Sequence, residues 1–320
     1  MFKNKNIFIS GITGSWGHEL TNQLLSLNVK KIKGYSRNEF NQVFMGREYN
    51  NPKIELILGD VRDKDAIIKA MKDSDIVIHL AAVKHVPLAE CQPDEAIKTN
   101  IIGTQNIIEA ANKNNVEMVI DVSSDKSVGP VNIYGMTKAI GERIILNASQ
   151  TNKDIKFMVV RAGNALGSSG SILQFFIDQI KKNNRVPITH LEMTRFFITL
   201  PEAIDLVLCA CNVNISGGLL VMKMPSCKIV DLAEVLIEEF GNKDTKIEEI
   251  GIRPGEKIHE ELISESETPW TYYYDDKYFL FHLYKNLDYK KVEFKKYSSN
   301  YKLMSKEEIR KLLVRGGFLK

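Results

Sequence analysis

Short apolar segments that alternate with helical segments dominate the first half of this 320-residue chain. Their apolar content suits strands that are buried on both faces of a sheet. We expect strands at Asn6–Ser10, Lys31–Tyr35, Ile54–Leu58, Asp75–Leu80, Val116–Val122 and Phe157–Val160. Strands separated by helices are joined by right-handed crossovers. The sequence therefore predicts an α/β fold with a doubly wound parallel sheet of the Rossmann type.

The expected helices continue beyond the strand series. They lie at Trp16–Leu27, Lys64–Lys72, Ala96–Asn112, Tyr134–Ala148, Pro201–Cys211, Ile229–Phe240 and Lys306–Val314. The last one begins with a capping box formed by Ser305 and Glu308. After Arg161 the alternation loosens, so we expect a larger first domain at 1–161. A smaller lobe with a C-terminal extension would occupy 162–320, and the chain would cross back to the first domain.

Composition excludes several classes of partner. The net charge is only +3, which implies no general attraction to nucleic acid or to membranes. We see no signal peptide and no apolar run of about 20 residues, so we expect a soluble cytoplasmic protein. The four cysteines are not arranged as C-x-x-C pairs, which favours free, mostly buried thiols and no metal site. They are Cys91, Cys209, Cys211 and Cys227.

Three glycines follow the first expected strand and open the first helix. Gly11, Gly14 and Gly17 are spaced G-x-x-G-x-x-G. Glycines at such a junction permit a tight turn and let a pyrophosphate approach the helix N-terminus. This position between strand and helix predicts a dinucleotide-binding loop.

The end of the second strand bears on the choice between NAD and NADP. It reads Tyr35-Ser36-Arg37, and a hydroxyl with a guanidinium suits a 2′-phosphate. We therefore expect NADP, although a solvated surface arginine is the alternative and Glu39 leaves NAD open. Asp60-Val61 follows the third strand, where an Asp can meet the adenine edge. Ala81-Ala82 follows the fourth, where small side chains would let the cofactor pass.

A tyrosine and a lysine one helical turn apart form the first catalytic candidate. Tyr134 and Lys138 share a helix face, and the ammonium would lower the pKa of the phenol toward neutrality. The phenolate could then take a proton from a sugar hydroxyl while hydride leaves for the nicotinamide. Tyr49/Lys53 and Tyr273/Lys277 have the same spacing. Only Tyr134 begins the helix after the fifth strand, so we choose that pair.

An acid and a base end the fifth strand, next to a serine. Ser124, Asp125 and Lys126 would lie at the carboxyl edge of the sheet, where open parallel sheets bind ligands. Hydride transfer alone needs no such pair. Elimination of water needs a base for the proton beside a carbonyl and an acid for the departing hydroxyl. A surface Asp-Lys pair is the alternative interpretation.

With these motifs the chain resembles the extended short-chain dehydrogenases/reductases. More narrowly, it is similar to the UDP-N-acetylglucosamine 4,6-dehydratases, and best to the configuration-inverting branch that opens pseudaminic acid biosynthesis. The resemblance covers about residues 5–262. Its matching stretches are residues 10–17, 35–39, 59–63, 81–87, 98–100, 124–126, 132–135, 193–196 and 251–257.

The resemblance implies roles for further residues. Tyr134 would take the O4 proton, Lys126 the C5 proton, and Asp125 would protonate the departing C6 hydroxyl. Thr13, Ser15, Trp16, Lys84 and Asn100 would join the cofactor site. Lys84, His85, Asn164, Arg195, Arg253 and Glu256 would hold the UDP-sugar. Members assemble as homo-oligomers, as hexamers or dimers.

Several positions depart from the pattern of those dehydratases. Ser124 replaces a threonine, Ala162 an aromatic residue, Ser169 an arginine and His190 an aspartate. These changes leave open whether the product is inverted at C5 or is the 5,6-ene intermediate. Trp270, Tyr272, Tyr273 and Tyr274 form a lid, an oligomer contact or core. The rival functions are a UDP-sugar 4-epimerase and a non-catalytic NADP-binding sensor, and retention of the Tyr/Lys pair argues against the sensor.

Overall fold

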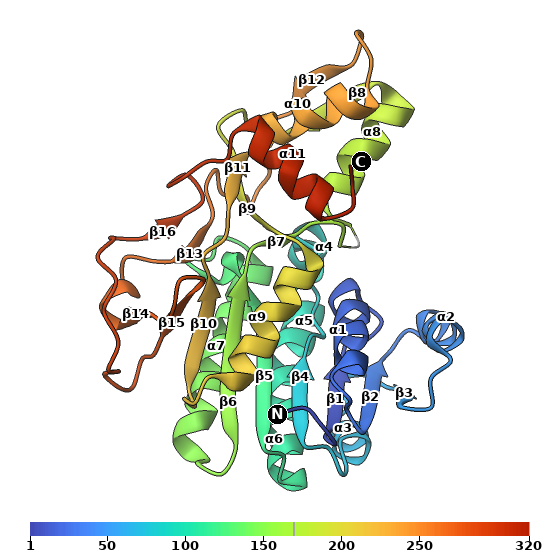
Figure 1. The fold of residues 1–320 in the computed structure, drawn as a ribbon, viewed down its shortest axis with the longest axis vertical. Coiled ribbons are helices and arrows are strands. Elements are labelled where there is room, and N and C mark those ends of the chain that lie inside the picture. Colours follow the sequence, from blue (N-terminus) through green and yellow to red (C-terminus); the bar gives the residue numbers. More distant parts are fainter. Residues whose placement is uncertain (169, 320) are drawn as a thin grey trace.

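A long twisted sheet forms the base of the molecule, as the computed structural model of residues 1–168 and 170–319 shows (Figure 1). Within this part of the chain the sheet has nine strands in the order β14-β15-β10-β6-β5-β4-β1-β2-β3. The run from β10 to β3 is parallel throughout. Its strands are β1 (Asn6–Ser10), β2 (Lys31–Ser36), β3 (Ile54–Leu58), β4 (Ile76–His79), β5 (Met118–Ser124), β6 (Lys156–Ala162) and β10 (Gly218–Met222). The predicted α/β class and parallel sheet are confirmed.

Helices cover both faces of this sheet. On one face α1 (Ser15–Ser26) packs against α9 (Leu200–Asn212). On the other, α6 (Gly103–Asn114) lies between α3 (Lys64–Ala70) and α7 (Ile133–Thr151). The strands are buried between these layers; Ile7, Phe8 and Ile9, for example, are fully inaccessible to solvent. Continuous apolar strands are what a sheet covered on both faces requires.

The predicted helix at Ala96–Asn112 differs from the observed structure. It consists of α5 (Pro93–Ile97), a π-helical turn at Lys98–Ile102, and α6. The start of α6 passes close to the segment that follows β3, because a Cβ on Gly103 would lie 2.8 Å from Cγ2 of Val61. Three helices were not predicted at all: α2 (Glu39–Tyr49), α4 (Val86–Cys91) and α8 (Ile172–Asn183).

The C-terminal region returns to the edge of the main sheet. There β14 (Thr271–Tyr273) and β15 (Tyr278–Phe281) form an antiparallel hairpin, and β15 pairs antiparallel with β10. A short connection joins β14 to β15 and accounts for the antiparallel pairing of these two strands. Tyr272 is 1% exposed and belongs to the core, whereas Trp270 is 38% exposed.

A second, smaller hydrophobic core supports the upper lobe in Figure 1. It is formed by α8, α10 (Ile229–Phe240) and α11 (Lys306–Arg315), beside the pair β8 (Arg185–Ile188) and β12 (Lys246–Glu249). The predicted helix at Ile229–Phe240 and the capping box of Ser305 and Glu308 are confirmed. The division at Arg161 stays a prediction.

Two small sheets connect the lobe to the base. One is built from β7 (Asn164–Ala165), β9 (Thr194–Ile198) and β11 (Ser226–Lys228). The other pairs β13 (Glu261–Ile263) with β16 (Tyr297–Ser298). Segments far apart in the sequence therefore meet directly above the carboxyl ends of the parallel strands, and this is where a ligand is expected in such a sheet.

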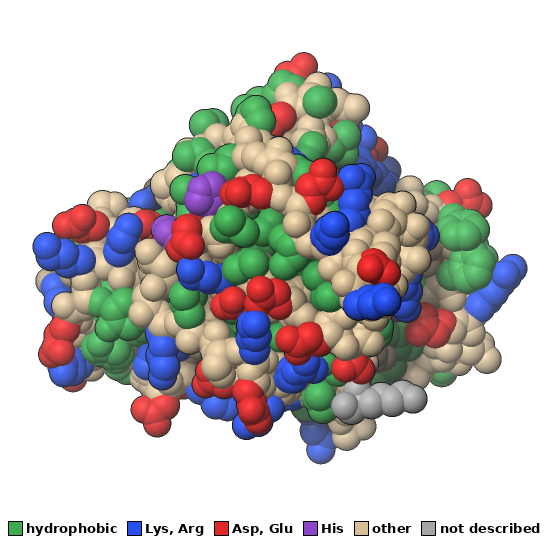
Figure 2. All heavy atoms as spheres, turned by 90° about the horizontal axis from the view of Figure 1, so that it is seen from above, with side chains coloured by type: hydrophobic (Ala, Val, Ile, Leu, Met, Phe, Trp, Pro, Cys, Tyr) green, Lys and Arg blue, Asp and Glu red, His purple; other side chains and the backbone are tan. Residues whose placement is uncertain are grey.

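The surface seen in Figure 2 carries basic and acidic side chains side by side. A green patch at its right edge lies over α2, where Phe40, Val43 and Phe44 are exposed. Across the described residues, no helix combines the length and the apolar character that crossing a membrane requires. Cys211 and Cys227 are buried and Cys209 is half-buried, whereas Cys91 is exposed and is the exception to the expected burial of the thiols.

Candidate active site

A cleft of about 1490 Å³ separates the sheet from the upper lobe. The segments that follow β1, β2, β3, β4 and β5 form its floor, and residues of the lobe form its roof. Nearly all of the sequence-predicted site residues line it. They are Gly11, Thr13, Gly14, Ser15, Trp16, Gly17, Ser36, Arg37, Asp60, Val61, Ala81, Ala82, Lys84, His85, Ser124, Lys126, Tyr134, Lys138, Asn164, Arg195, Arg253 and Glu256. Asp125 and Asn100 do not reach the cleft wall.

The glycine loop places the N-terminus of α1 at the cleft. Gly11 has a φ of +75°, and a Cβ there would lie 2.8 Å from the backbone nitrogen of Ala81. A Cβ on Gly17 would lie 2.0 Å from the carbonyl oxygen of Ile12. The N-cap residue Gly14 gives α1 no side-chain cap. The first-turn N–H groups of α1 therefore face the cleft, as a pyrophosphate site requires.

The end of β2 carries a cation beside a carboxylate. Arg37 Nη1 lies 3.9 Å from Asp60 Oδ2, and the Arg37 side chain is 57% exposed. Arg62 binds the same carboxylate more tightly, at 2.6 Å. Burial acts to raise the pKa of Asp60, but the hydrogen bonds from Arg62 lower it overall. With Asp60 occupied by Arg62, the exposed Arg37 guanidinium can turn toward an anionic ligand.

Asn100 lies behind the cleft wall. Its side-chain oxygen accepts from the Val83 N–H at 2.8 Å, and its Nδ2 donates to the Val83 carbonyl at 3.0 Å. The same Nδ2 donates to Thr137 Oγ1 at 2.9 Å. These bonds fix the segment that carries Ala82 and Lys84, so Asn100 shapes the site from behind rather than facing the cleft.

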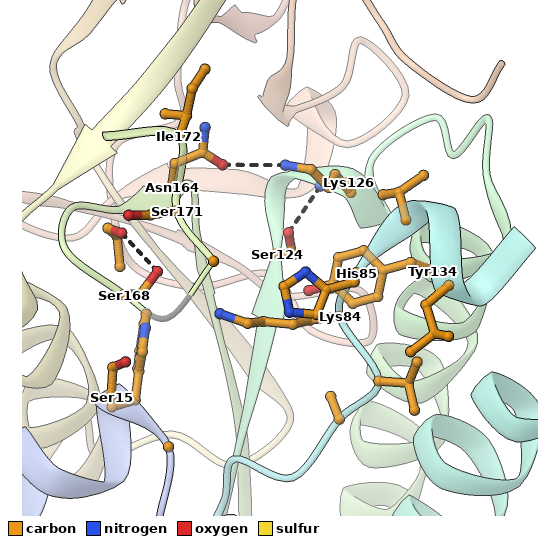
Figure 3. Close-up of a pocket in the computed structure, with 18 of the residues that line it drawn as sticks. Ser15, Lys84, His85, Ser124, Lys126, Tyr134, Asn164, Ser168, Ser171 and Ile172 are labelled. Atoms are coloured by element: carbon orange, nitrogen blue, oxygen red, sulfur yellow. Dashed lines mark hydrogen bonds between the residues drawn. The ribbon is translucent and has the colours of Figure 1, made fainter. Parts of the chain in front are cut away.

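The acid–base pair follows β5 in a short 3₁₀ turn. Ser124 Oγ donates to Asp125 Oδ1 at 2.8 Å, and Lys126 Nζ donates to the same oxygen at 3.0 Å. Asp125 is fully buried, and its Oδ2 has no hydrogen-bond partner among the described residues. Lys126 Nζ also donates to Asn164 Oδ1 at 3.3 Å across the cleft, as Figure 3 shows.

Tyr134 and Lys138 lie in the first turns of α7. Figure 3 shows Tyr134 pointing into the same pocket as Ser124 and Lys126. Lys138 is buried, with its Nζ 3.4 Å from Asp121 Oδ2. The other two Tyr/Lys matches do not share a helix: Tyr49 ends α2, and Tyr273 ends β14. The structure thus brings one of the three pairs to the cleft.

Lys84 and His85 project between the floor and the glycine–serine loop of the roof (Figure 3). A Cβ on Gly170 would lie 2.6 Å from the His85 ring. Burial lowers the pKa of Lys84. A cation in a partly buried cleft favours an anionic or hydroxyl-rich ligand.

The two predicted diphosphate arginines have different environments. Arg195 is 8% exposed, and its guanidinium donates to the carbonyls of Thr194, Lys257 and Ile258. Arg253 is exposed at the cleft, and its backbone N–H donates to the Glu256 carboxylate at 3.1 Å. The Arg195 side chain therefore links two backbone segments above the cleft, whereas the Arg253 side chain lies exposed at the cleft.

The departures from the dehydratase pattern fall in different places. Ala162 is buried and lines the cleft, while His190 does not line it. Ser169 lies outside the described residues.

One buried carboxylate in the site was not predicted. Glu260 is 3% exposed, lines the cleft and lies 3.8 Å from Lys126 Nζ. It follows the glycine-rich stretch 251–257 by three residues. Within His259-Glu260-Glu261 its sequence looks like a solvated charged turn, so its burial depends on long-range packing.

Comparisons with known proteins agree with this arrangement. The family model described as "Polysaccharide biosynthesis protein" matches residues 7–281. A UDP-N-acetylglucosamine 4,6-dehydratase (inverting) of Campylobacter jejuni subsp. jejuni is 43% identical, over 87% of this chain and 83% of its own length. A UDP-glucose 4-epimerase of Rickettsia bellii is 42% identical, over 83% of this chain and 80% of its own.

A solved structure is similar along the whole chain. The X-ray structure of Pen from Bacillus thuringiensis is 38% identical, covers 100% of both chains and has a TM-score of 0.94. The chain therefore belongs to the polysaccharide biosynthesis protein family of extended short-chain dehydrogenases/reductases, which includes relatives named as nucleotide-sugar dehydratases and epimerases.

Proposed function

We propose that this protein is an NADP-dependent UDP-N-acetylglucosamine 4,6-dehydratase that acts at the opening step of pseudaminic acid biosynthesis. The observation that carries the proposal is that Lys126 and Tyr134 lie at one cleft, with Asp125 bonded to Lys126 from behind the cleft wall. Lys126 Nζ is bonded to Asp125 and reaches the cleft, where Tyr134 also points. An acid and a base next to a hydride-transfer tyrosine are what removal of water requires.

The chain's own residues fit a dinucleotide cofactor. The close approach of Gly11 to Ala81 and the uncapped start of α1 leave backbone N–H groups for a pyrophosphate. Ser36 and Arg37 would hold the 2′-phosphate of NADP, with NAD as the alternative. When bound, the cofactor would take hydride from C4 and return it at C6.

The protein side chains would move the protons. Tyr134, with Lys138 one turn away, would take the proton from O4 as C4 is oxidised. The resulting 4-keto group acidifies the C5–H bond. Lys126 would remove that proton, the C5 electron pair would form the C5–C6 double bond, and the C6–O bond would break. Asp125 would supply the proton for the departing hydroxyl through Ser124, whose hydroxyl lines the cleft and is hydrogen-bonded to Asp125, so that water leaves.

The product depends on the steps that come after elimination. Return of hydride to C6 with protonation of C5 on the opposite face would give the inverted 4-keto-6-deoxy sugar. Departure before these steps would give the 5,6-ene. Ala162, which pairs with Ser124 in the sheet, and Asn164, which is bonded to Lys126, both line the cleft, and a small side chain at 162 would leave more room for the sugar. Both products share the same dehydration step.

NMR of the purified protein with NADP and UDP-N-acetylglucosamine in deuterated water tests the proposal. We expect loss of the C6 oxygen, seen as a C6 methyl or an exocyclic methylene signal. Deuterium at C5, together with the ring couplings, would separate inversion from retention and from the ene. A sugar spectrum that stays unchanged would overturn the proposed function.

A 4-epimerase is the second candidate, and the Rickettsia bellii relative bears that name. Epimerisation needs Tyr134 and the cofactor but no acid for a leaving hydroxyl. If Asp125→Asn left turnover of UDP-N-acetylglucosamine intact, epimerisation would replace dehydration as the better account.

A further inference from the structure

A second carboxylate faces the base of the candidate site, and the proposed reaction gives it no task. Glu260 Oε1 lies 3.8 Å from Lys126 Nζ. Asp125 Oδ1 lies 3.0 Å from the same nitrogen, and Asn164 Oδ1 lies 3.3 Å from it. Lys126 Nζ thus donates hydrogen bonds to Asp125 and Asn164, and Glu260 lies within ion-pair distance but beyond hydrogen-bond distance. Lys126 is thus held as a cation between two carboxylates from distant parts of the chain.

The two carboxylates differ in their own surroundings. Glu260 is flanked by two further cations, with Lys257 Nζ at 3.6 Å and Arg195 Nε at 4.0 Å. Among the described residues, the Asp125 carboxylate accepts hydrogen bonds from Lys126 and the Ser124 hydroxyl through Oδ1, and its Oδ2 is buried and unpaired, as is Oε2 of Glu260. Asp125 Oδ1 is within hydrogen-bond distance of Lys126 Nζ, whereas Glu260 Oε1, at 3.8 Å, is not. A proton that leaves Lys126 can therefore pass directly to Asp125 but not to Glu260.

That asymmetry matches what elimination demands of the pair. A lysine can remove the C5 proton only after it has lost one of its own. Transfer of one proton from Lys126 to Asp125 creates the amine base and the carboxylic acid together, with no change in net charge. Asp125 can then protonate the leaving hydroxyl through Ser124, and the amine takes the C5 proton and becomes an ammonium again.

We propose that Glu260 is a positioning residue for this proton transfer: its carboxylate holds Lys126 in place while Asp125 carries the mobile proton. This inference rests on the proposed dehydratase function. Once Asp125 is neutral, the Glu260 charge is the anion left beside Lys126. It stabilises the ammonium that forms when C5 is deprotonated, and so makes Lys126 a stronger base.

The C-terminal region holds Glu260 at this position. The backbone N–H of Glu260 donates to Ser299 Oγ at 3.0 Å, and the N–H of Ser299 donates to the Glu260 carbonyl at 2.8 Å. Ser299 Oγ also lies 2.6 Å from Thr194 Oγ1, next to Arg195. Through the pair of β13 and β16, residues C-terminal to about 262, where the family resemblance ends, therefore contribute to the site: they hold the Glu260 carboxylate near Lys126.

The decisive variant is Glu260→Gln, which removes the charge and keeps the shape. We expect a roughly 10- to 100-fold lower kcat for dehydration, with KM for UDP-N-acetylglucosamine within about twofold of the original. The rate of deuterium exchange at C5 should fall by the same factor, while reduction of NADP at 340 nm in a single turnover should persist. Glu260→Asp, which restores the charge on a shorter side chain, should recover part of the loss.

The pH profile separates positioning from a purely structural role. Besides Asp125 and Glu260, the charged or titratable groups close to Lys126 are Arg195 and Tyr134. Burial acts to lower the pKa of Lys126, but the two carboxylates raise it overall. Glu260→Gln should therefore shift the alkaline limb of the dehydration rate, where the Lys126–Asp125 pair loses the proton that the leaving hydroxyl needs, to lower pH by about 1 unit.

The neighbouring Glu261→Gln is the matched control, because Glu261 pairs with Lys296 and does not line the cleft. It should retain the original rate and pH profile. A melting curve shows whether Glu260→Gln is folded. If the folded variant dehydrates the sugar at the original rate, with the alkaline limb at the original pH, the inference fails while the proposed function stands. If the unaltered protein does not dehydrate the sugar, the proposed function itself fails.

Discussion

The Nζ atom of Lys138 lies 3.4 Å from Oδ2 of Asp121, in the interior between α7 and β5. Burial raises the pKa of Asp121 to about 6, although Lys138 acts to lower it. Glu142 and His79 are the other titratable groups near this pair. The Asp121 charge offsets the Lys138 ammonium, which would otherwise stabilise a phenolate at Tyr134. Asp121 therefore weakens the effect of Lys138 on the proposed O4 base at neutral pH.

The variant Asp121→Asn tests this relationship. Without the carboxylate, the Lys138 ammonium acts undiminished on the phenolate that forms when Tyr134 gives up its proton. We expect the acid limb of NADP reduction at 340 nm to move to lower pH by about 1 unit. Exposed Asp154 provides the control variant Asp154→Asn. An acid limb that stays in place in Asp121→Asn would show that Lys138 is not coupled to Tyr134.

Two substitutions should stop the proposed reaction at different stages. Tyr134→Phe removes the base for O4, so both NADP reduction and dehydration should fall by roughly 10²- to 10⁴-fold. Asp125→Asn removes only the acid for the C6 hydroxyl, so NADP reduction should remain while dehydration falls by a similar factor. Rapid-mixing absorbance at 340 nm and NMR of the sugar measure the two stages. Equal loss of both signals in Asp125→Asn would place Asp125 in the first stage.

The parallel strands could be predicted from sequence because each must be apolar along its whole length. Ile76-Val77-Ile78 is buried on both faces, and no competing pattern explains such a run. Helix α2 could not be predicted in this way, because Phe40, Val43 and Phe44 lie on its exposed surface and give it no apolar face turned inward. Helix α8 follows a glycine–serine stretch that predicts only a loop.

The site was predictable where function depends on local sequence. Gly11, Tyr134 and Lys126 each lie at the end of an element whose type is readable from the chain, and the carboxyl edge of the sheet gathers them. Glu260 and Asp121 depend on tertiary packing instead. Glu260 reaches Lys126 across 134 positions of sequence, through β13 and β16. A charged residue in a loop carries no sign of such burial.

The Arg37 guanidinium should set the cofactor preference. Its side chain is 57% exposed at the cleft end of β2, where a 2′-phosphate would lie. Arg37→Ala should weaken NADP binding by about 10-fold or more and leave NAD binding nearly unchanged, since only NADP carries the extra phosphate. Fluorescence titration with each cofactor measures the two affinities. Arg47→Ala, on the exposed surface of α2, is the control. Equal loss for both cofactors would remove the assignment of Arg37 to the 2′-phosphate.

A buried network around Arg161 should dominate the stability of the base. Arg161 is 2% exposed and binds Glu142 at 2.6 Å and Glu267 at 2.9 Å. In Glu267→Ala the Arg161 guanidinium keeps one carboxylate partner, and its Nη1 and Nη2 atoms each lose a hydrogen bond. We therefore expect a loss of about 3 kcal/mol in the free energy of unfolding. Urea denaturation measures this loss. The exposed Glu265→Ala should change stability by less than about 0.5 kcal/mol. Similar values for the two variants would mean that the network does not stabilise the fold.

Acid should destabilise the protein through His79, which is 1% exposed on β4. Its Nδ1 lies 2.6 Å from Ser10 Oγ and its Nε2 lies 3.3 Å from Thr104 Oγ1. Burial lowers the pKa of His79 to about 3, and the nearby Lys138 charge acts in the same direction. The unfolded chain binds a proton at this side chain below about pH 6.5, whereas the folded protein does not. Stability is therefore lost as the pH falls from about 6.5 toward 3.

The expected loss from His79 between pH 7 and pH 5 is about 2 kcal/mol. Asp121 acts in the opposite direction over part of this range, because its raised pKa lets the folded protein take up a proton near pH 6. A comparison of His79→Asn with the unaltered protein removes that contribution, which both share. Urea denaturation at the two pH values should show that the variant gains about 2 kcal/mol relative to the unaltered protein at pH 5. Parallel pH dependence of the two proteins would mean that His79 takes up its proton as readily in the folded chain as in the unfolded one.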